Sequence, residues 1–228
     1  MGQTYFDKLT KDQRTNIGII IKDLRSKSIT NTFTQAGVLS VVSKESLFIP
    51  KFEKGYQKTA NERIRLIFGK YVSSYSDEAL AKLKADEVAF FNAIYGSRYG
   101  NGPLEGWKFR GGGLNQITFK DNYAKAAIDT GIDLITHPER INEVLIAAGA
   151  LRGYFMRSFK HAPNSILQHY STIGFNDFKT LDDAVKAIYH ANAGWGKSYT
   201  ALEADTTGGR RKALERASGF LEIVKKTV

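Results

Sequence analysis

The sequence predicts one mainly helical domain with a single short β-hairpin. Apolar residues recur at roughly helical spacing through most of the 228-residue chain, which is typical of amphipathic helices. Ser, Thr, Asp and Asn, the residue types that cap helix N-termini, precede several of these segments. One glycine-rich segment, residues 95–123, departs from the helical period and is where we expect the hairpin.

The first part of the chain predicts helices separated by short turns. Asn31 or Thr32 is expected to cap the second helix, and Pro50 follows its end. A capping box runs from Thr59 to Glu62. The expected helices cover residues 5–28, 31 to 45–48, 59–68, a short stretch from 76 or 77, and 86–96.

The second part predicts a long apolar helix. A capping box from Thr136 to Glu139, with Pro138 in the first turn, begins it, and it extends to about Phe159. Because it is apolar on nearly all sides, we expect it to be the central buried helix. With no repeat or low-complexity linker, residues 1–228 are interpreted as a single domain. The other expected helices are 120–130, 180–190 and 209–226.

The glycine-rich segment is not a flexible linker, because its glycines alternate with aromatic and aliphatic side chains rather than with small polar ones. Two short runs, Trp107–Arg110 and Leu114–Thr118, predict a small hairpin joined through the glycine triplet. That hairpin would place Gln116 and Thr118 on the same face. Turns, aromatics and uncharged amides suit a groove for a neutral polar polymer such as a glycan. A purely structural glycine-rich turn is the alternative.

Composition excludes some kinds of site. The chain has no cysteine, so disulfides and cysteine-based zinc sites are excluded. Its four histidines show no close helical pairing, and we expect neither a metal site nor a cofactor. The formal charge is +10, which attracts polyanions such as nucleic acid, anionic membrane or phosphate-bearing cell wall. No nucleic-acid-binding module is present, so nucleic acid is not an expected partner.

The amino terminus lacks the apolar core of a secretory signal peptide, and Phe6 interrupts the myristoylation pattern. No apolar run approaches the length of a membrane span. We therefore expect a monomer that is made in the cytoplasm without its own export signal and that does not insert stably into membranes.

Two carboxylates stand in unlike surroundings. Glu45 ends an apolar helix, where partial burial favours the protonated form that a general acid needs. Glu53 lies among lysines, which favour its ionised form. Two carboxyl groups in such different environments are what glycoside hydrolysis requires. The alternative is an ordinary structural role, with Glu45 at a helix end and Glu53 paired with Lys51 or Lys54.

Together these pieces resemble glycoside hydrolase family 19, a chitinase-like family, and in particular its phage and bacterial endolysin branch. The resemblance extends over about residues 36–216, and its most specific part is the run GWKFRGGGLNQIT at residues 106–118. The matching pieces, in chain order, are Glu45-Ser46, Glu53 to Tyr56, Tyr95 to Tyr123, and Asn192 to Gly196.

The resemblance implies a lysozyme-like, two-lobed helical fold with the glycan in a cleft between the lobes and the hairpin beside it. It places the general acid on Glu45 and the base that activates water on Glu53, with Thr118 helping to hold the water. The residues that it matches to substrate binding are Gln116, Thr118, Asn122, Tyr123 and Asn192.

The sequence also departs from the family pattern. Lys44 stands where members often have His, Gly112 where they usually have Arg, Glu105 where they have Asp, and Ala193 where they have Gly. If Glu53 is not the base, the base is Glu62 or Glu105, or the reaction is substrate-assisted. The run from Glu45 to Pro50 also resembles lytic transglycosylases, in which one Glu acts as acid and then base and the sugar's own 6-hydroxyl attacks.

The leading hypothesis is an endolysin: a peptidoglycan-degrading, inverting glycosidase without a separate wall-binding module. It would reach the wall after a holin-type release or from a virion. The alternatives are a chitinase acting on N-acetylglucosamine polymers, a lytic transglycosylase, and a glycan-binding module without turnover. A membrane-active last helix is a further alternative, because that helix is basic; its apolar residues are instead expected to face the core.

Overall fold

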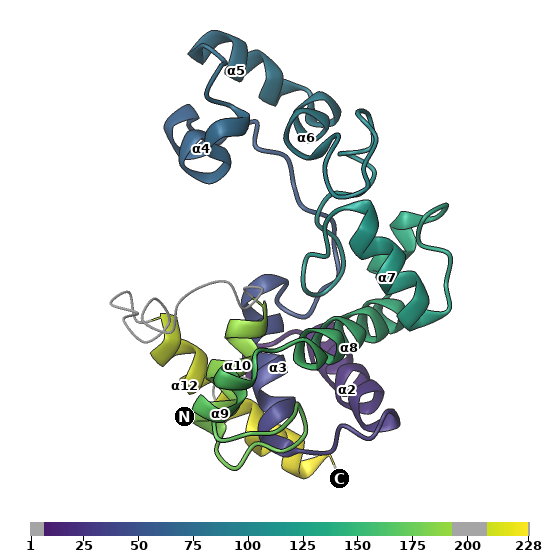
Figure 1. The fold of residues 1–228 in the computed structure, drawn as a ribbon, viewed down its shortest axis with the longest axis vertical. Coiled ribbons are helices and arrows are strands. Elements are labelled where there is room, and N and C mark those ends of the chain that lie inside the picture. The colour runs from purple at the N-terminus through teal and green to yellow at the C-terminus, as the bar shows by residue number, and fades with distance from the viewer. Residues whose placement is uncertain (1–6, 193–208, 228) are drawn as a thin grey trace.

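The computed structural model describes residues 7–192 and 209–227, and these residues form helices without a named strand. Figure 1 shows two groups of helices joined through the region around α7. The large lobe contains α2 (Lys11–Ser26), α3 (Thr32–Glu45), α8 (Val144–Lys160), α9 (Asn164–His169), α10 (Leu181–Asn192) and α12 (Gly209–Lys226). The small lobe contains α4 (Asn61–Phe68), η1 (Gly69–Tyr71), α5 (Asp77–Ala85) and α6 (Glu87–Tyr95). Between them lie α7 (Lys120–Thr130) and η2 (Pro138–Asn142).

The large lobe is built around α3. Every residue from Thr34 to Ser43 is buried, because α3 packs against both α10 and α12. Its buried polar side chains have backbone partners: Thr34 donates to the carbonyl of Phe175 at 2.6 Å, and Gln35 donates to that of Ile29 at 2.6 Å. Asn31 caps the helix, as the sequence predicts.

The predicted long helix of residues 136–159 is interrupted, which corrects the sequence interpretation. Pro138–Asn142 forms a 3-10 turn, and Glu143, with an extended ψ of 124°, separates it from α8. The interruption leaves the Asn142 side chain free to accept a hydrogen bond from the backbone of Gly113 at 2.9 Å. From Val144 onward α8 is largely buried. Arg152 pairs with Asp23 of α2 at 2.9 Å.

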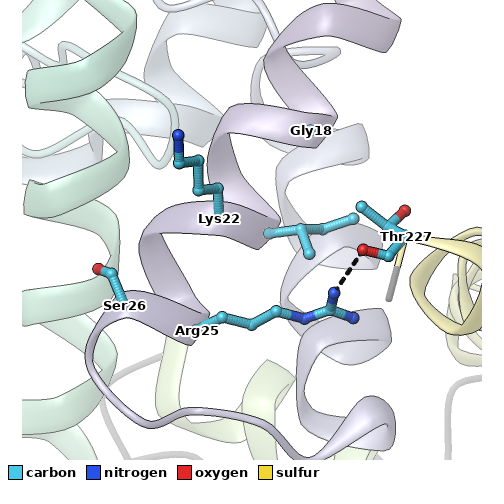
Figure 2. Close-up of a pocket in the computed structure, with 6 residues that line it drawn as sticks. Gly18, Lys22, Arg25, Ser26 and Thr227 are labelled. Atoms are coloured by element: carbon cyan, nitrogen blue, oxygen red, sulfur yellow. Dashed lines mark hydrogen bonds between the residues drawn. The ribbon is translucent and has the colours of Figure 1, made fainter.

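The C-terminal end of α12 is held by α2 (Figure 2). Arg25 donates to the carbonyls of Val224 and Thr227, both at 2.8 Å. These carbonyls belong to the last turn of a helix and have no partner within it, so the guanidinium serves as a C-cap supplied by another helix. The neighbouring cavity of about 580 Å³ is lined by α2 residues and Thr227.

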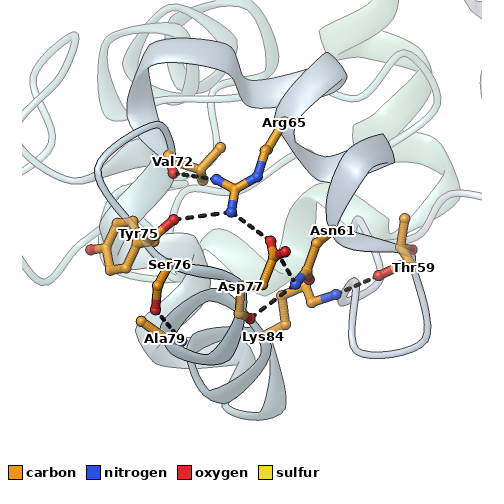
Figure 3. Close-up of polar contacts among 9 residues, drawn as sticks. All are labelled: Thr59, Asn61, Arg65, Val72, Tyr75, Ser76, Asp77, Ala79 and Lys84. Atoms are coloured by element: carbon orange, nitrogen blue, oxygen red, sulfur yellow. Dashed lines mark hydrogen bonds and ion pairs between the residues drawn. The ribbon is translucent and has the colours of Figure 1, made fainter.

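A polar cluster organises the small lobe (Figure 3). Arg65 donates to the carbonyls of Val72 and Tyr75 and pairs with Asp77 at 2.7 Å. It thereby joins α4 to the turn before α5. Ser76 caps α5 as predicted, but the predicted capping box at residues 59–62 does not form: α4 begins after Ala60 without a side-chain cap.

The predicted β-hairpin is absent from the residues that the structure describes. In its place a single antiparallel bridge joins Gly112 and Ile117, with hydrogen bonds of 3.0 and 2.8 Å. Beyond the bridge the backbone N–H of Phe119 still donates to the Phe109 carbonyl at 2.8 Å, but the two carbonyls directly before Gly112 have other partners. The backbone N–H of Glu53 donates to the Gly111 carbonyl at 2.7 Å, and the Tyr123 hydroxyl donates to the Arg110 carbonyl at 2.9 Å.

Within residues 7–192 and 209–227, no helix is long and apolar enough to span a bilayer. The same residues contain no group of three His, Cys, Asp or Glu side chains placed to hold a metal ion.

Candidate active site

A cavity of about 340 Å³ brings together most of the predicted site residues. It lies where the end of α3, the end of α10 and the glycine-rich segment meet. The predicted residues that line it are Glu45, Gln116, Thr118, Asn122 and Asn192. The sequence did not identify the other lining residues as part of the site. They are Asn115, Ile117, Phe119 and Tyr154.

Glu45 is the last residue of α3 and is half-buried. Its carboxylate makes no hydrogen bond or ion pair with another side chain in the described parts of the chain. The turn after it is strained, with positive φ values of 53° at Leu47 and 63° at Phe48. Two amides of α2 hold this turn: Gln13 donates to the Leu47 carbonyl at 3.0 Å and Asn16 to the Phe48 carbonyl at 2.9 Å. Such strain, maintained by surrounding contacts, is a feature of functional sites.

Tyr154 faces Glu45 from α8 and was not predicted. Burial, and secondarily the negative charge of Glu45, raises the pKa of Tyr154, so its hydroxyl stays protonated at neutral pH. That hydroxyl donates to the carbonyls of Ala191 and Asn192, each at 3.3 Å. Tyr154 therefore fixes the end of α10, where Asn192 reaches the cavity. The remaining residues of the predicted Asn192 motif, 193–196, lie outside the described residues.

The opposite wall includes uncharged polar side chains that donate hydrogen bonds to backbone carbonyls. Gln116, at a positive φ of 55°, donates to the carbonyl of Lys51 at 3.0 Å. Thr118 donates to the Gln116 carbonyl at 3.0 Å, and Asn122 donates to the Thr118 carbonyl at 2.9 Å. These bonds use side-chain N–H groups of Gln116 and Asn122 as donors, and each amide keeps a side-chain oxygen that can accept a hydrogen bond.

Glu53 does not line this cavity, and its environment differs from the one expected. The structure shows no ion pair between Glu53 and Lys51 or Lys54 among the described residues. Instead the Tyr56 hydroxyl donates to Oε1 at 2.7 Å, and the Tyr95 hydroxyl donates to Oε2 at 3.1 Å. Burial first, and then the contact with Glu53, raises the pKa of both tyrosines. Both hydroxyls are therefore donors, and together they clamp the carboxylate.

Gly111 lies beside both the Gln116 side chain of the cavity wall and the Glu53 carboxylate. A methyl group on Gly111 would lie 2.9 Å from Gln116 Oε1 and 3.3 Å from Glu53 Oε2. The cavity wall and the clamped carboxylate thus approach the same point of the backbone, and glycine is the residue that leaves this space open. Gln116, which lines the cavity, and Glu53, which does not, therefore both approach Gly111.

Tyr123, which the resemblance matches to substrate binding, does not line the cavity. It is fully buried, and its hydroxyl donates a hydrogen bond to the Arg110 carbonyl. A side chain on Gly112 would lie 2.6 Å from that hydroxyl and 2.8 Å from Ile141. The buried tyrosine accounts for glycine at position 112, where the resembling family usually has arginine.

The two fallback bases lie in structural positions. Glu105 accepts from the Gly102 backbone at 2.8 Å and pairs with Lys120 at 3.0 Å. The Gly102 hydrogen bond and then Lys120 hold the pKa of Glu105 below its ordinary value, against the opposing effect of burial. Glu62 is exposed on α4 in the small lobe. Neither residue lines the cavity that contains Glu45.

Comparison with known proteins gives one short similarity. A 36-residue stretch is 61% identical to part of a Glycosyl hydrolase family 19 domain-containing protein from Haemophilus influenzae. That stretch covers 14% of this chain and 18% of the other protein, so the chain matches well under two thirds of that protein's length. No family model matches the chain. The similarity is a partial one, and it points to glycoside hydrolases.

Proposed function

We propose that this protein is a glycoside hydrolase that cleaves the amino-sugar backbone of peptidoglycan. The observation that carries the proposal is the contrast between its two carboxylates. Glu45 has no side-chain partner in the described structure and faces a cavity walled by amides and hydroxyls, while two tyrosines hold Glu53 nearby. An unpaired acid, a positioned carboxylate and neutral polar walls are the components of a glycosidase site. The partial similarity to a family 19 protein supports the same reaction.

In the proposed mechanism Glu45 donates its proton to the glycosidic oxygen as the bond to the anomeric carbon breaks. Glu53, acting as general base, removes a proton from a water molecule that attacks this carbon from the opposite face. Thr118 and Gln116, which line the cavity with Glu45, would hold that water, while Asn122 and Asn192 would bind the sugar. The product would have inverted anomeric configuration, a mechanism in which the carboxyl groups are about 6.5–9.5 Å apart.

Charge favours peptidoglycan over chitin as the substrate. The chain carries a formal charge of +10, and a basic protein concentrates at an anionic envelope. We propose that it acts as a monomer, in the manner of an endolysin, on wall that it reaches after release from the producing cell or from a virion. We also propose that the fold is lysozyme-like.

The test is mass spectrometry of the products from purified peptidoglycan, comparing wild type with Glu45→Gln. We expect reducing-end fragments from wild type and a loss of at least about 100-fold in Glu45→Gln, the scale of a missing general acid. Glu62→Gln, an exposed glutamate on α4, is the matched control. Full activity in Glu45→Gln would refute the assignment of the acid. Anhydro-sugar ends would identify a transglycosylase, and cleavage of chitin alone would reassign the substrate.

A further inference from the structure

A cation and several aromatic rings form a cluster beside the proposed active site. The Arg98 guanidinium lies 3.9 Å from the ring centroid of Tyr71, 5.0 Å from that of Phe119 and 5.8 Å from that of Tyr99. Guanidinium groups at such distances are attracted to aromatic faces. Arg98 also donates to the carbonyl of Ile94 at 2.6 Å. These contacts hold the guanidinium in one orientation.

Most N–H groups of the Arg98 guanidinium make no hydrogen bond within the described chain. No carboxylate of the described chain forms an ion pair with Arg98, and none of its nitrogens is among the buried atoms without a partner. Because an arginine has five N–H donors and only one is used here by the protein, the others face solvent. Tyr99 beside it is 64% exposed, which is unusual for a large ring in contact with two other side chains of a cluster.

The cluster is continuous with the cavity. Phe119 lines the cavity that contains Glu45, and its ring centroid lies 4.8 Å from that of Tyr99. Phe119 adopts a positive φ of 75°, which a bulky residue adopts only when its surroundings enforce it. A polymer that occupies the cavity and continues past Phe119 would therefore meet the exposed face of Tyr99 and the free edge of Arg98.

We propose that Arg98 and Tyr99 form a subsite for a sugar that carries a carboxylate. This inference rests on the proposed glycosidase function and names the feature by which the site selects its substrate. Aromatic faces stack on sugar rings, and a guanidinium binds carboxylate through two parallel hydrogen bonds. The peptidoglycan backbone carries a lactyl acid on alternate sugars, free or extended by a peptide with its own carboxylates, whereas chitin is neutral. Arg98 would thus distinguish the two polymers.

Binding measurements test the subsite separately from catalysis. Isothermal titration would use the Glu45→Gln protein, in which turnover is blocked, with three probes: peptide-bearing glycan strands, strands stripped of peptides, and neutral N-acetylglucosamine oligomers. The quantity of interest is the ratio of affinities for acidic over neutral glycan. We expect Arg98→Gln to lower this ratio about tenfold, the effect of losing charge-assisted hydrogen bonds. Arg63→Gln, which removes an exposed charge on α4, should leave the ratio within about twofold.

Arg98→Lys keeps the charge and removes the two-point geometry, so it should lower the ratio by a smaller factor and serves if Arg98→Gln does not fold. A loss confined to the stripped strands assigns the free lactyl acid, and a loss confined to peptide-bearing strands assigns the peptide carboxylates. A loss for both acidic probes shows that Arg98 accepts either carboxylate. An unchanged ratio, or equal losses for acidic and neutral glycans, overturns the subsite. If wild type releases no products but the ratio still depends on Arg98, the hydrolase proposal fails and the subsite stands.

Discussion

The tyrosine clamp on Glu53 gives the sharpest prediction. If Glu53 is the base, Tyr56→Phe should slow catalysis by removing the shortest of its three hydroxyl contacts, 2.7 Å long. The ring itself should stay in place, because it packs against Phe68 and Phe90 at centroid distances of 5.2 and 5.5 Å. The substitution therefore changes the position of the carboxylate with little change in the fold.

The expected loss of rate follows from the hydrogen bonds that the two tyrosines make to Glu53. A hydrogen bond to a charged group contributes about 1.5–3 kcal/mol, and each 1.4 kcal/mol corresponds to about tenfold in rate. We expect Tyr56→Phe to lower kcat about tenfold or more. Tyr95→Phe should cost less, because its contacts are longer, at 3.1 and 3.3 Å. The double variant should approach the loss seen in Glu53→Gln.

The assay is release of reducing ends from purified peptidoglycan at one pH, with kcat and KM measured separately. Losing a donor leaves the carboxylate less firmly positioned, so we expect kcat to fall in Tyr56→Phe with little change in KM. Tyr75→Phe is the matched control, because Tyr75 packs in the same small-lobe core and its hydroxyl has no hydrogen bond recorded in the described structure.

A kcat of Tyr56→Phe within about twofold of wild type would refute the reasoning. The hydroxyl contact would then be incidental to catalysis. If Glu53→Gln were equally mild, Glu53 would have no part in the reaction, and a mechanism using Glu45 alone would replace the two-carboxylate one.

Three further predictions follow from single contacts. Gly111→Ala should lower kcat about tenfold with little change in melting temperature, because its methyl group would contact Gln116 and Glu53 at 2.9 and 3.3 Å; unchanged activity would contradict this. Glu105 has a pKa lowered mainly by Gly102, so its contribution to stability is present above pH about 4.5 and lost on acidification. Denaturation from pH 7 to 3 should accordingly show the difference between wild type and Glu105→Gln shrinking as pH falls. Arg25→Met should lower the free energy of unfolding by about 1–2 kcal/mol, measured by urea denaturation against Lys22→Met, since only Arg25 caps α12.

The helices were predictable where a local signal coincides with the tertiary arrangement. Asn31 and Ser76 both act as caps, and the last helix has the predicted bounds within its described residues. The capping box at residues 136–139 misled the prediction because Glu143 interrupts the helix. Its extended backbone is compatible with Asn142 reaching Gly113, a contact over 29 residues that no local pattern encodes. The short α9 likewise lacked a recognisable start signal.

The cavity could be predicted in part. The glycine-rich motif identified Gln116, Thr118 and Asn122, and all three line it. Tyr123, from the same motif, is buried. Consecutive residues of a helix point about 100° apart, and only the packing of the whole region decides which of them faces the core. The partners of Glu53 were also misjudged. Nearby lysines in the sequence suggested ion pairs, but their exposed side chains compete poorly with hydroxyls positioned by an aromatic core.

The supports of the two carboxylates come from different parts of the molecule. The turn after Glu45 is held by α2, in the large lobe. The Glu53 carboxylate is held by Tyr56 and Tyr95, which pack on the small-lobe core, while its backbone is bonded to Gly111. The separation of acid and base therefore depends on how the lobes are placed relative to each other. Substitutions at either support should change kcat without altering the residues that contact sugar, and this separability is what a two-carboxylate mechanism on this fold requires.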